Sequence, residues 1–237
     1  DYVLKCLTPN VKPGSNLVSI LPMAHMYGLA VEFLFGFING CHLYFLNRMP
    51  SPSLIAEAFA EVKPRLIVAV PLVIEKIIRR KVLAEVQTNR MKLLLNMPVI
   101  NKKIKQHIRD RIMEAFGGNA FEIIVGGAPL NQGIEEFLNS VGVPVTIGYG
   151  TTETAPLITF ANYDKYKIAS CGPVVDHMEA KVVSPDPANV PGELIARGMN
   201  VMLGYYKNEE ATNAVLDKDG WFHTGDLATM APSGHIY

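Results

Sequence analysis

Short apolar segments alternate along the first two thirds of the chain with longer segments in which apolar residues recur at helical spacing. The short segments are rich in Val, Ile, Leu and aromatic residues and are bounded by Gly, Pro or Asn, which is typical of buried strands. Strands that alternate with helices indicate a mainly parallel sheet covered on both faces. Five strands are expected, at residues 17–21, 43–46, 66–70, 121–125 and 143–147.

Two of the intervening helices carry clear boundary signals. Ser51 can cap a helix whose first turn accepts Pro52, and this helix is expected to run to about Val62. A second helix is expected over residues 131–140, because Asn131 is a capping residue and Gly142 lies just past the end.

A basic stretch from residue 72 to residue 116 predicts two helices broken near Pro98. Residues 75–116 hold 11 basic and 4 acidic side chains, a net charge of +7. Ile104, Ile108, Ile112 and Ala115 fall on one helical face, and the basic residues lie largely off it. The favoured interpretation is a solvated helical face. The alternative is a peripheral contact of residues 75–116 with anionic lipid or with the phosphates of a ligand.

The pattern changes after about residue 165, where helical periodicity disappears. Short strands such as 180–183 and 193–196 lie among Pro and Gly turns, which indicates a small antiparallel barrel or sheet. The predicted fold class is therefore α/β: a mainly parallel sheet flanked by helices, followed by a small antiparallel β-barrel-like region. The predicted domains are residues 1–164 and residues 165–237.

The amino-acid composition is that of an ordinary globular protein. Of the 237 residues, 49% are hydrophobic, and the 22 basic and 22 acidic side chains balance, so the overall charge predicts no nucleic-acid partner. Three distant cysteines without a CxxC pair favour a reducing, cytoplasmic location over a disulfide framework or zinc site. No apolar run is long enough to span a bilayer. Because the chain begins without Met and ends in a strand-like GHIY, we expect a piece of a longer protein.

The segment GYGTTET, residues 148–154, is the most informative candidate for chemistry, because it follows the expected strand 143–147. Ligands of open α/β sheets bind at the carboxyl ends of strands. Gly148 and Gly150 allow close approach of a ligand, Tyr149 offers a face for stacking, and the threonine hydroxyls can donate to phosphate. Glu153 could bind Mg²⁺, which takes oxygen ligands. Taken alone, a Gly/Thr-rich turn with a solvated Glu is the commoner interpretation.

Three further segments are candidates of the same kind. Residues 126–130, GGAPL, also follow a strand and precede a helix, and their glycines suit close contact with a flat ring; the plain alternative is a strand-to-helix turn. Residues 221–227, WFHTGDL, place Asp226 after a turn glycine, where a carboxylate can accept both hydroxyls of a ribose. His25 lies in the apolar segment LPMAHMYG, where a satisfied core histidine is the commoner interpretation. The chain contains neither a GxxxxGK[ST] nor a GxGxxG loop.

The joint order of these segments changes the interpretation. Pro-x-x-His, GGAPL, GYGTTE, GEL-x-x-RG-x-x-x-x-x-GY and W-x-x-TGD follow one another along nearly the whole chain. This order resembles the adenylate-forming superfamily of acyl-CoA synthetases, luciferases and peptide-synthetase adenylation domains. The resemblance implies that the chain is part of the large N-terminal domain of that fold.

The resemblance implies a reaction in two halves. A carboxylate attacks the α-phosphate of ATP to give acyl-AMP and pyrophosphate, and a thiol, usually that of CoA, then displaces AMP. The implied cofactors and substrates are ATP, Mg²⁺, CoA and a carboxylic acid. Since that acid is already ionised at neutral pH, the enzyme has to position it rather than remove a proton.

The same resemblance implies roles for single residues. Gly126, Gly127, Ala128 and Pro129 would contact adenine and wall the acyl channel, and His25 and Gly148 would help to shape the acyl pocket. Tyr149 would pack on adenine beside Gly150 and Thr151, Thr152 would bond the α-phosphate, Glu153 would bind Mg²⁺, and Asp226 would hold the ribose. The implied catalytic residues are Thr152 and Glu153, and residues 193–205 would be mostly structural.

Two features are similar to long-chain fatty acyl-CoA synthetases. One is the helical stretch around residues 75–116, and the other is the segment YGTTETAPLI. Medium-chain, aryl and amino acids remain alternatives, as does an acyl-carrier-protein thiol in place of CoA. The competing class is a non-catalytic module that binds nucleotide or a partner protein. Relative to the superfamily pattern, the chain lacks the Ser/Thr/Gly-rich phosphate loop and the mobile C-terminal domain with its catalytic lysine. We therefore expect negligible synthetase activity from these 237 residues alone.

Overall fold

The computed structural model describes residues 10–79 and 98–237, and these form two compact units. One unit comprises residues 3–146 and the other residues 147–237, and each is described by itself. The predicted boundary at 164/165 rests on a change in composition and stays a prediction.

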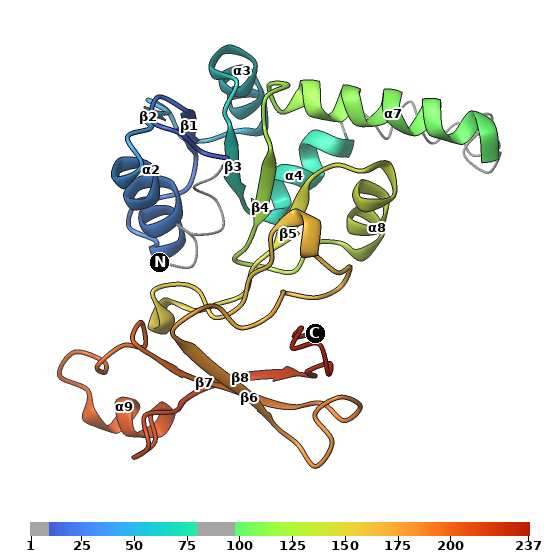
Figure 1. Cartoon of the computed structure of the whole chain (residues 1–237). Helices are drawn as coiled ribbons and strands as arrows, with labels where there is room; N and C mark the ends of the chain where they lie inside the picture. The colour runs from blue at the N-terminus through green and yellow to red at the C-terminus, as the bar shows by residue number, and fades with distance from the viewer. Residues whose placement is uncertain (1–9, 80–97) are drawn as a thin grey trace. The chain divides into compact units, whose positions relative to one another are not determined.

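The first unit is built on a five-stranded sheet with the order β2-β1-β3-β4-β5 (Figure 1). The β1–β2, β1–β3 and β3–β4 pairs are parallel, as expected from strands that alternate with helices. All four residues of β3 and of β4 are buried, because helices cover both faces. The strands are β1 (Asn16–Ser19), β2 (His42–Phe45), β3 (Leu66–Ala69), β4 (Glu122–Val125) and β5 (Val145–Ile147), each within two residues of its predicted bounds.

Two helices of this unit confirm the predicted caps. Helix α3 (Pro52–Val62) begins after Ser51, whose hydroxyl accepts a hydrogen bond from the Leu54 amide at 3.3 Å. Helix α8 (Gln132–Val141) begins after Asn131, whose side-chain oxygen accepts from the Ile134 amide at 3.2 Å. It ends at Gly142, in the left-handed conformation that favours glycine there.

The basic stretch contributes α4 (Pro71–Ile78) and α7 (Pro98–Ala115), and the rest of it lies outside the described residues. Ile108 and Ile112 of α7 are buried and Lys102 and Lys103 are exposed, as the helical spacing predicts. Helix α7 contacts α3 and α8, and the Phe59 and Phe116 rings lie 6.2 Å apart. None of the described helices is long and apolar enough to cross a bilayer.

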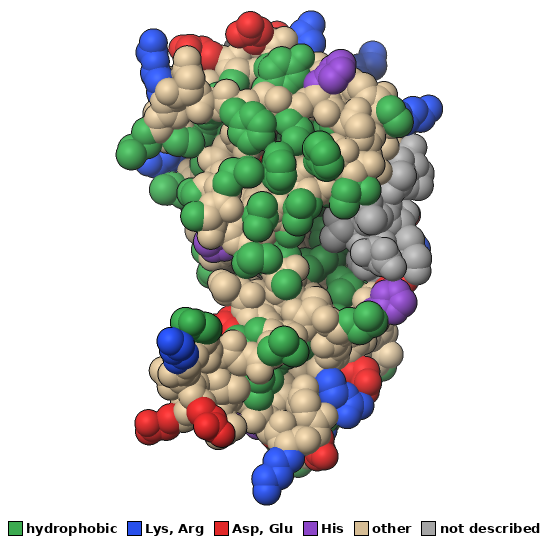
Figure 2. Space-filling model, turned by 90° about the vertical axis from the view of Figure 1, so that its left-hand side faces the viewer, with side chains coloured by type: hydrophobic (Ala, Val, Ile, Leu, Met, Phe, Trp, Pro, Cys, Tyr) green, Lys and Arg blue, Asp and Glu red, His purple; other side chains and the backbone are tan. Residues whose placement is uncertain are grey.

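A π-helical segment η1 (Gly28–Leu34) continues into α2 (Phe35–Ile38), and η1 contacts both β1 and β3. Apolar side chains gather on the surface of this unit in Figure 2. Around α2 and the edge strand β2, the exposed ones are Leu34, Phe37, Ile38, Tyr44 and Phe45.

The second unit contains an antiparallel sheet of β6 (Met178–Val183), β7 (Gly192–Gly198) and β8 (Phe222–Ala228). Of the two predicted alternatives, barrel or sheet, the described residues form a sheet, in the order β6-β7-β8. Val182 and Leu194 pack with Ala228 and Ile236 in its core. Trp221, the sole tryptophan of the sequence, makes cation–π contacts with two side chains. Lys181 Nζ lies 4.1 Å and Arg197 Cζ 4.7 Å from its ring centroid.

One expectation for this unit was wrong. A helix, α9 (Glu209–Val215), is present where helical periodicity was judged absent, because none of its residues is buried and no apolar stripe marks it. It begins at Asn208, whose side chain accepts from the Ala211 amide. The strand-like segment 234–237 pairs through antiparallel bridges, from His235 to Pro173 and from Ile236 to Met230.

Candidate nucleotide and acyl site

The loop that follows β5 is a compact turn closed by its own threonines. A 3-10 turn, η3 (Thr152–Thr154), begins after Thr151. The Thr151 amide donates to Thr154 Oγ1 at 3.0 Å, and the Thr154 amide donates back to the Thr151 carbonyl at 3.1 Å. Thr154 is fully buried, so its hydroxyl fixes the turn from inside, whereas Thr151, Thr152 and Glu153 are partly exposed.

Gly150 is required by a close approach of the chain to itself. A Cβ at this position would lie 1.8 Å from the Pro156 carbonyl oxygen, far inside van der Waals contact. The glycine therefore allows the two ends of the loop to touch, and it holds the Thr151–Thr154 turn against the segment that leaves it.

Glu153 presents a carboxylate that accepts hydrogen bonds from its surroundings. Tyr205 Oη donates to Glu153 Oε1 at 2.8 Å, and the Met202 amide donates to the Glu153 carbonyl at 2.7 Å. Partial burial opposes ionisation, but hydrogen bonds from its own amide, from Tyr205 and from Thr151 outweigh that effect and lower the pKa of Glu153. The side chain is thus a carboxylate at neutral pH, as a metal ligand must be.

Asp226 is joined to Tyr149 within the same unit. The Tyr149 hydroxyl donates to Asp226 Oδ2 at 2.5 Å, and the Tyr149 ring packs on the core of the β6-β7-β8 sheet. Burial and the neighbouring carboxylate raise the pKa of Tyr149, so the hydroxyl stays protonated and remains a donor. Asp226 itself is exposed and can meet a ligand.

The turn that carries Asp226 is tied to β7 through Glu193. One oxygen of Glu193 pairs with His223 Nδ1 at 2.9 Å, and the other accepts from the Gly225 amide at 3.2 Å. Thr224 Oγ1 donates to the Leu194 carbonyl and accepts from the Asp226 amide. His223 is therefore an anchoring residue of this turn.

The glycine pair of GGAPL lies in the first unit, directly after β4. Gly126 is buried, whereas Gly127, Ala128 and Pro129 are exposed. Gly127 has a φ of +80°, and among the residues that the structure describes a Cβ there would meet Val70 alone within 4 Å, at 3.7 Å. This loop is consequently an open backbone surface at the carboxyl end of a strand.

Tyr27 packs on the back of that loop. A Cβ on Gly126 would lie 3.1 Å from Tyr27 Cζ, and the Tyr27 hydroxyl donates to the Ile124 carbonyl at 3.1 Å. His25 is exposed, and its Nδ1 accepts from the Tyr27 amide at 3.2 Å, so the core-histidine interpretation is wrong. His25 thus shapes the turn that delivers Tyr27 to Gly126.

Glu32, which the sequence analysis did not select, is buried under the start of this turn. Its carboxylate accepts hydrogen bonds from the Ser19 hydroxyl, the Ile20 amide and the Leu21 amide. Burial nevertheless raises the pKa of Glu32 to about 7. The available signal was a lone acidic residue in the apolar run GLAVEFLFGF.

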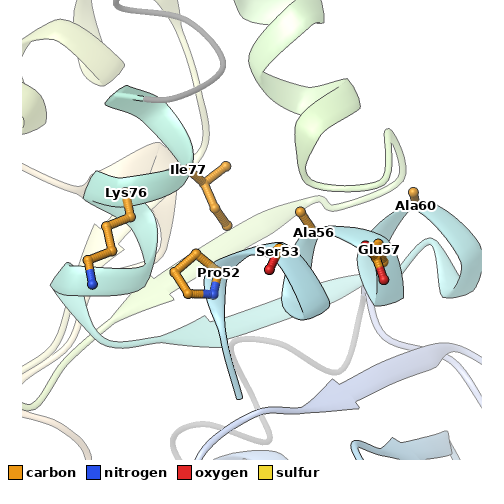
Figure 3. Close-up of a pocket in the computed structure, with 7 residues that line it drawn as sticks. All are labelled: Pro52, Ser53, Ala56, Glu57, Ala60, Lys76 and Ile77. Atoms are coloured by element: carbon orange, nitrogen blue, oxygen red, sulfur yellow. The ribbon is translucent and has the colours of Figure 1, made fainter. Parts of the chain in front are cut away.

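The structure therefore pairs Tyr149 with Asp226 and Glu153 with Tyr205 in the second unit, and His25 with Gly126 through Tyr27 in the first. A separate groove of about 340 Å³ lies between α3 and α4 and contains none of the predicted site residues (Figure 3). Its walls include Pro52, Ala56 and Ile77, with Glu57 and Lys76 at the sides.

Comparison with known proteins defines the class. Residues 2–206 match the AMP-binding enzyme family, and the chain belongs to that family of adenylate-forming enzymes. The chain is 28% identical to long-chain-fatty-acid–CoA ligase 1 of Saccharomyces cerevisiae over 93% of its own length and 35% of that protein. It is 32% identical to the long-chain-fatty-acid–CoA ligase of Escherichia coli O157:H7, over 96% of the chain and 36% of that protein. The chain thus spans about a third of the length of these relatives.

Solved structures show the same fold. ATP-bound MatB from Rhodopseudomonas palustris matches with a TM-score of 0.74 and 24% identity, over 100% of this chain and 41% of that one. The o-succinylbenzoate CoA synthetase MenE from Bacillus subtilis, in complex with ATP and magnesium, matches with a TM-score of 0.72 and 23% identity, over 100% and 43%. The predicted fold class and superfamily are both confirmed.

Proposed function

We propose that this chain supplies the nucleotide- and acid-binding part of an ATP-dependent fatty acid–CoA ligase that prefers long-chain acids. The observation that carries the proposal is the arrangement in residues 147–237. There an ionised Glu153 on a threonine turn and an exposed Asp226 on β8 are each held in place by a tyrosine hydroxyl. The threonine turn is proposed to bind phosphate and Mg²⁺, and Asp226 on β8 is proposed to bind the ribose.

On the nucleotide side, each group has one task. The hydroxyl of Thr152 would donate to the α-phosphate, with Thr151 and Gly150 shaping the turn beside it. Asp226 would accept the ribose hydroxyls, and Tyr149 would pack on adenine. Gly126, Gly127, Ala128 and Pro129 would offer backbone to the ring.

Mg²⁺ fits a site of this kind. The described residues contain no cluster of three or more His, Cys, Asp or Glu side chains that could hold a metal by themselves. Mg²⁺ commonly binds one or two carboxylates together with substrate phosphates. Glu153 would be the protein ligand, and the ion would neutralise phosphate charge.

The proposed reaction balances without an added base. A carboxylate oxygen of the fatty acid bonds to the α-phosphorus of ATP, and the bond to the bridging oxygen breaks, so pyrophosphate leaves. The thiol sulfur of CoA then bonds to the acyl carbon, AMP leaves, and the thiol proton passes to solvent. These residues act by positioning and charge stabilisation.

The preference for long-chain acids is supported by the names of the similar proteins from yeast and Escherichia coli. His25, Gly127 and Gly148 are the residues proposed to border the acyl pocket. Medium-chain, aryl or amino acids, and an acyl-carrier-protein thiol, are the alternatives that an experiment must separate.

The test is ATP–pyrophosphate exchange by the protein that carries this chain, with acids from acetate to oleate, aryl acids and amino acids. We expect exchange to peak with long-chain acids. Glu153→Gln should lower exchange by about 100-fold or more, because it removes the carboxylate that would hold Mg²⁺ at the phosphates. Glu210→Gln, at an exposed position of α9, is the matched control and should leave exchange unchanged.

Other outcomes are informative. A peak with amino acids would assign the protein to the adenylation domains of peptide synthetases. A folded protein that binds ATP but exchanges with no acid would be a non-catalytic nucleotide-binding module, and the proposal would be overturned.

The location that goes with this function is the cytoplasm, with peripheral contact at the inner membrane surface through residues 75–116. The exposed Lys102 and Lys103 of α7 support that contact. We expect cosedimentation with anionic vesicles that weakens with salt and on replacement of both lysines by Glu. Sedimentation that is indifferent to lipid charge and salt would contradict it.

A further inference from the structure

Residues 200–205, which follow β7, lie against the loop 151–157 and contact it through four hydrogen bonds. We call residues 200–205 the clamp segment. By resemblance this part of the chain was expected to be mostly structural. Its contacts with Glu153 indicate a more specific role.

Asn200 fixes the far side of the loop. Its side-chain amide donates to two backbone carbonyls, those of Thr154 at 2.5 Å and Leu157 at 2.9 Å. These carbonyls flank Ala155 and Pro156, where the chain turns back towards Gly150. One partly buried side chain thus satisfies two acceptors that no regular element of the loop pairs.

The other contacts converge on Glu153 itself. The Met202 amide holds its carbonyl at 2.7 Å, and the Tyr205 hydroxyl holds carboxylate oxygen Oε1 at 2.8 Å. The backbone and the side chain of one residue are therefore fixed by the same segment. A hydrogen bond to a carboxylate is among the stronger contacts available to a tyrosine.

Tyr205 is itself supported by α9. Its amide donates to Thr212 Oγ1 at 2.9 Å, and that hydroxyl donates to the Asn208 carbonyl at 2.7 Å. Gly204 has a φ of +145°, and a Cβ there would lie 2.8 Å from Thr212 Cγ2. The clamp segment is consequently anchored to α9 at Tyr205, so the Tyr205 hydroxyl can fix the orientation of the Glu153 carboxylate.

We propose that the clamp segment is the positioning element of the Glu153 carboxylate, with Tyr205 setting its direction and Asn200 fixing the loop that carries it. The catalytic consequence rests on the proposed function. A metal-binding carboxylate whose orientation is already fixed loses less conformational entropy when the metal and nucleotide bind. Tyr205 and Asn200 are positioning residues, since they act through Glu153.

The first test removes only the hydroxyl of Tyr205. In the protein that carries this chain, Tyr205→Phe should raise the Mg²⁺ concentration for half-maximal ATP–pyrophosphate exchange about tenfold. The KM for the acid and the melting temperature should stay unchanged. Tyr206→Phe is the matched control, because Tyr206 is 88% exposed and should change none of these. An unchanged Mg²⁺ dependence in Tyr205→Phe would overturn the role of Tyr205.

The second test needs no activity. Asn200→Asp keeps the shape of the side chain but removes both donors, so we expect hydrogen exchange of the Thr154 and Ala155 amides to become about tenfold faster in the ligand-free protein. Those amides bond within η3, to Thr151 and Thr152, so they report opening of the loop rather than loss of the Asn200 bonds. Asn213→Asp, on the exposed side of α9, is the control.

The two tests separate the clamp from the proposed function. If the unaltered protein shows no exchange with any acid, the function fails, and faster amide exchange in Asn200→Asp still supports the clamp. If those amides exchange at the unaltered rate, the clamp is overturned even in an active ligase.

Discussion

The two glycine-containing loops of the candidate site are held in opposite ways. The loop 126–129 is an exposed backbone surface supported from behind by the Tyr27 ring. The loop 148–157 is held by side chains from distant parts of its unit, with Asn200 and Tyr205 bonded to it from outside and Thr154 buried within it.

This difference matches what each loop has to offer a ligand. A backbone surface that meets a flat ring needs shape and little else, and an open glycine turn on a rigid strand provides it. A loop that presents a carboxylate to a metal ion and hydroxyls to phosphate must fix their directions, because charge stabilisation depends on geometry. Variants that affect only one loop can therefore test the comparison.

The largest expected effect is in the clamped loop. Gly150→Ala would place a Cβ 1.8 Å from the Pro156 carbonyl oxygen and should lower the free energy of unfolding by about 3 kcal/mol or more. Gly127→Ala, in the open loop, would place a Cβ at an ordinary contact distance of 3.7 Å from Val70 and should cost only about 1 kcal/mol for its positive φ. Urea denaturation of both variants measures the difference, and equal losses would contradict the comparison.

An effect of about 3 kcal/mol is expected from Glu32, which lies beneath the turn that supports the open loop. Burial raises its pKa from 4.5 to about 7, so between these values the folded chain keeps a proton that the unfolded chain loses. Stability should therefore fall as pH rises from about 4.5 to 7 and level off above, and Glu32→Gln should flatten this slope.

The measurement is denaturation at several pH values. Glu57→Gln, at an exposed position of α3, serves as the control and should preserve the slope. An unaltered slope in Glu32→Gln would show that Glu32 is ionised in the folded chain throughout this pH range.

The smallest expected effect is at the exit of the open loop. Asn131→Ala removes the cap of α8 and should cost about 1 kcal/mol in thermal or urea denaturation. Asn131→Ser keeps a capping oxygen and should retain most of that stability. The backbone amide of residue 131, which donates to Glu75, is kept in both variants, so a serine variant as unstable as the alanine variant would show that a side-chain oxygen at this position does not cap α8.

Local signals in the sequence predicted the elements that local chemistry determines. Ser51 and Asn131 act as caps within three residues of their partners, and buried strands such as β3 are recognisable from their own composition. The order of the glycine-rich segments likewise predicted the family. Helix α9 was missed because a helix with no buried residue carries no apolar period.

The contacts that hold the site could not be predicted in this way. Tyr205 and Glu153 are 52 residues apart, Asn200 and Leu157 are 43 apart, and Glu32 reaches back to Ser19. Such bonds depend on how the elements pack, and a tyrosine or asparagine in a polar turn gives no sign of its partner. The predicted ligand contacts of Thr152, Glu153 and Asp226 remain proposals for the same reason.

The position of the sole tryptophan gives each unit its own spectroscopic signal. Trp221 directly precedes β8 and contacts the cationic side chains of Lys181 and Arg197, so its emission reports the folding of residues 147–237. The helical circular dichroism comes mainly from the first unit, since α3, α4, α7 and α8 lie there and only the short α9 lies in the second. Coincident melting curves by the two signals would describe one cooperative transition, whereas separate midpoints would resolve the two units in unlabelled protein.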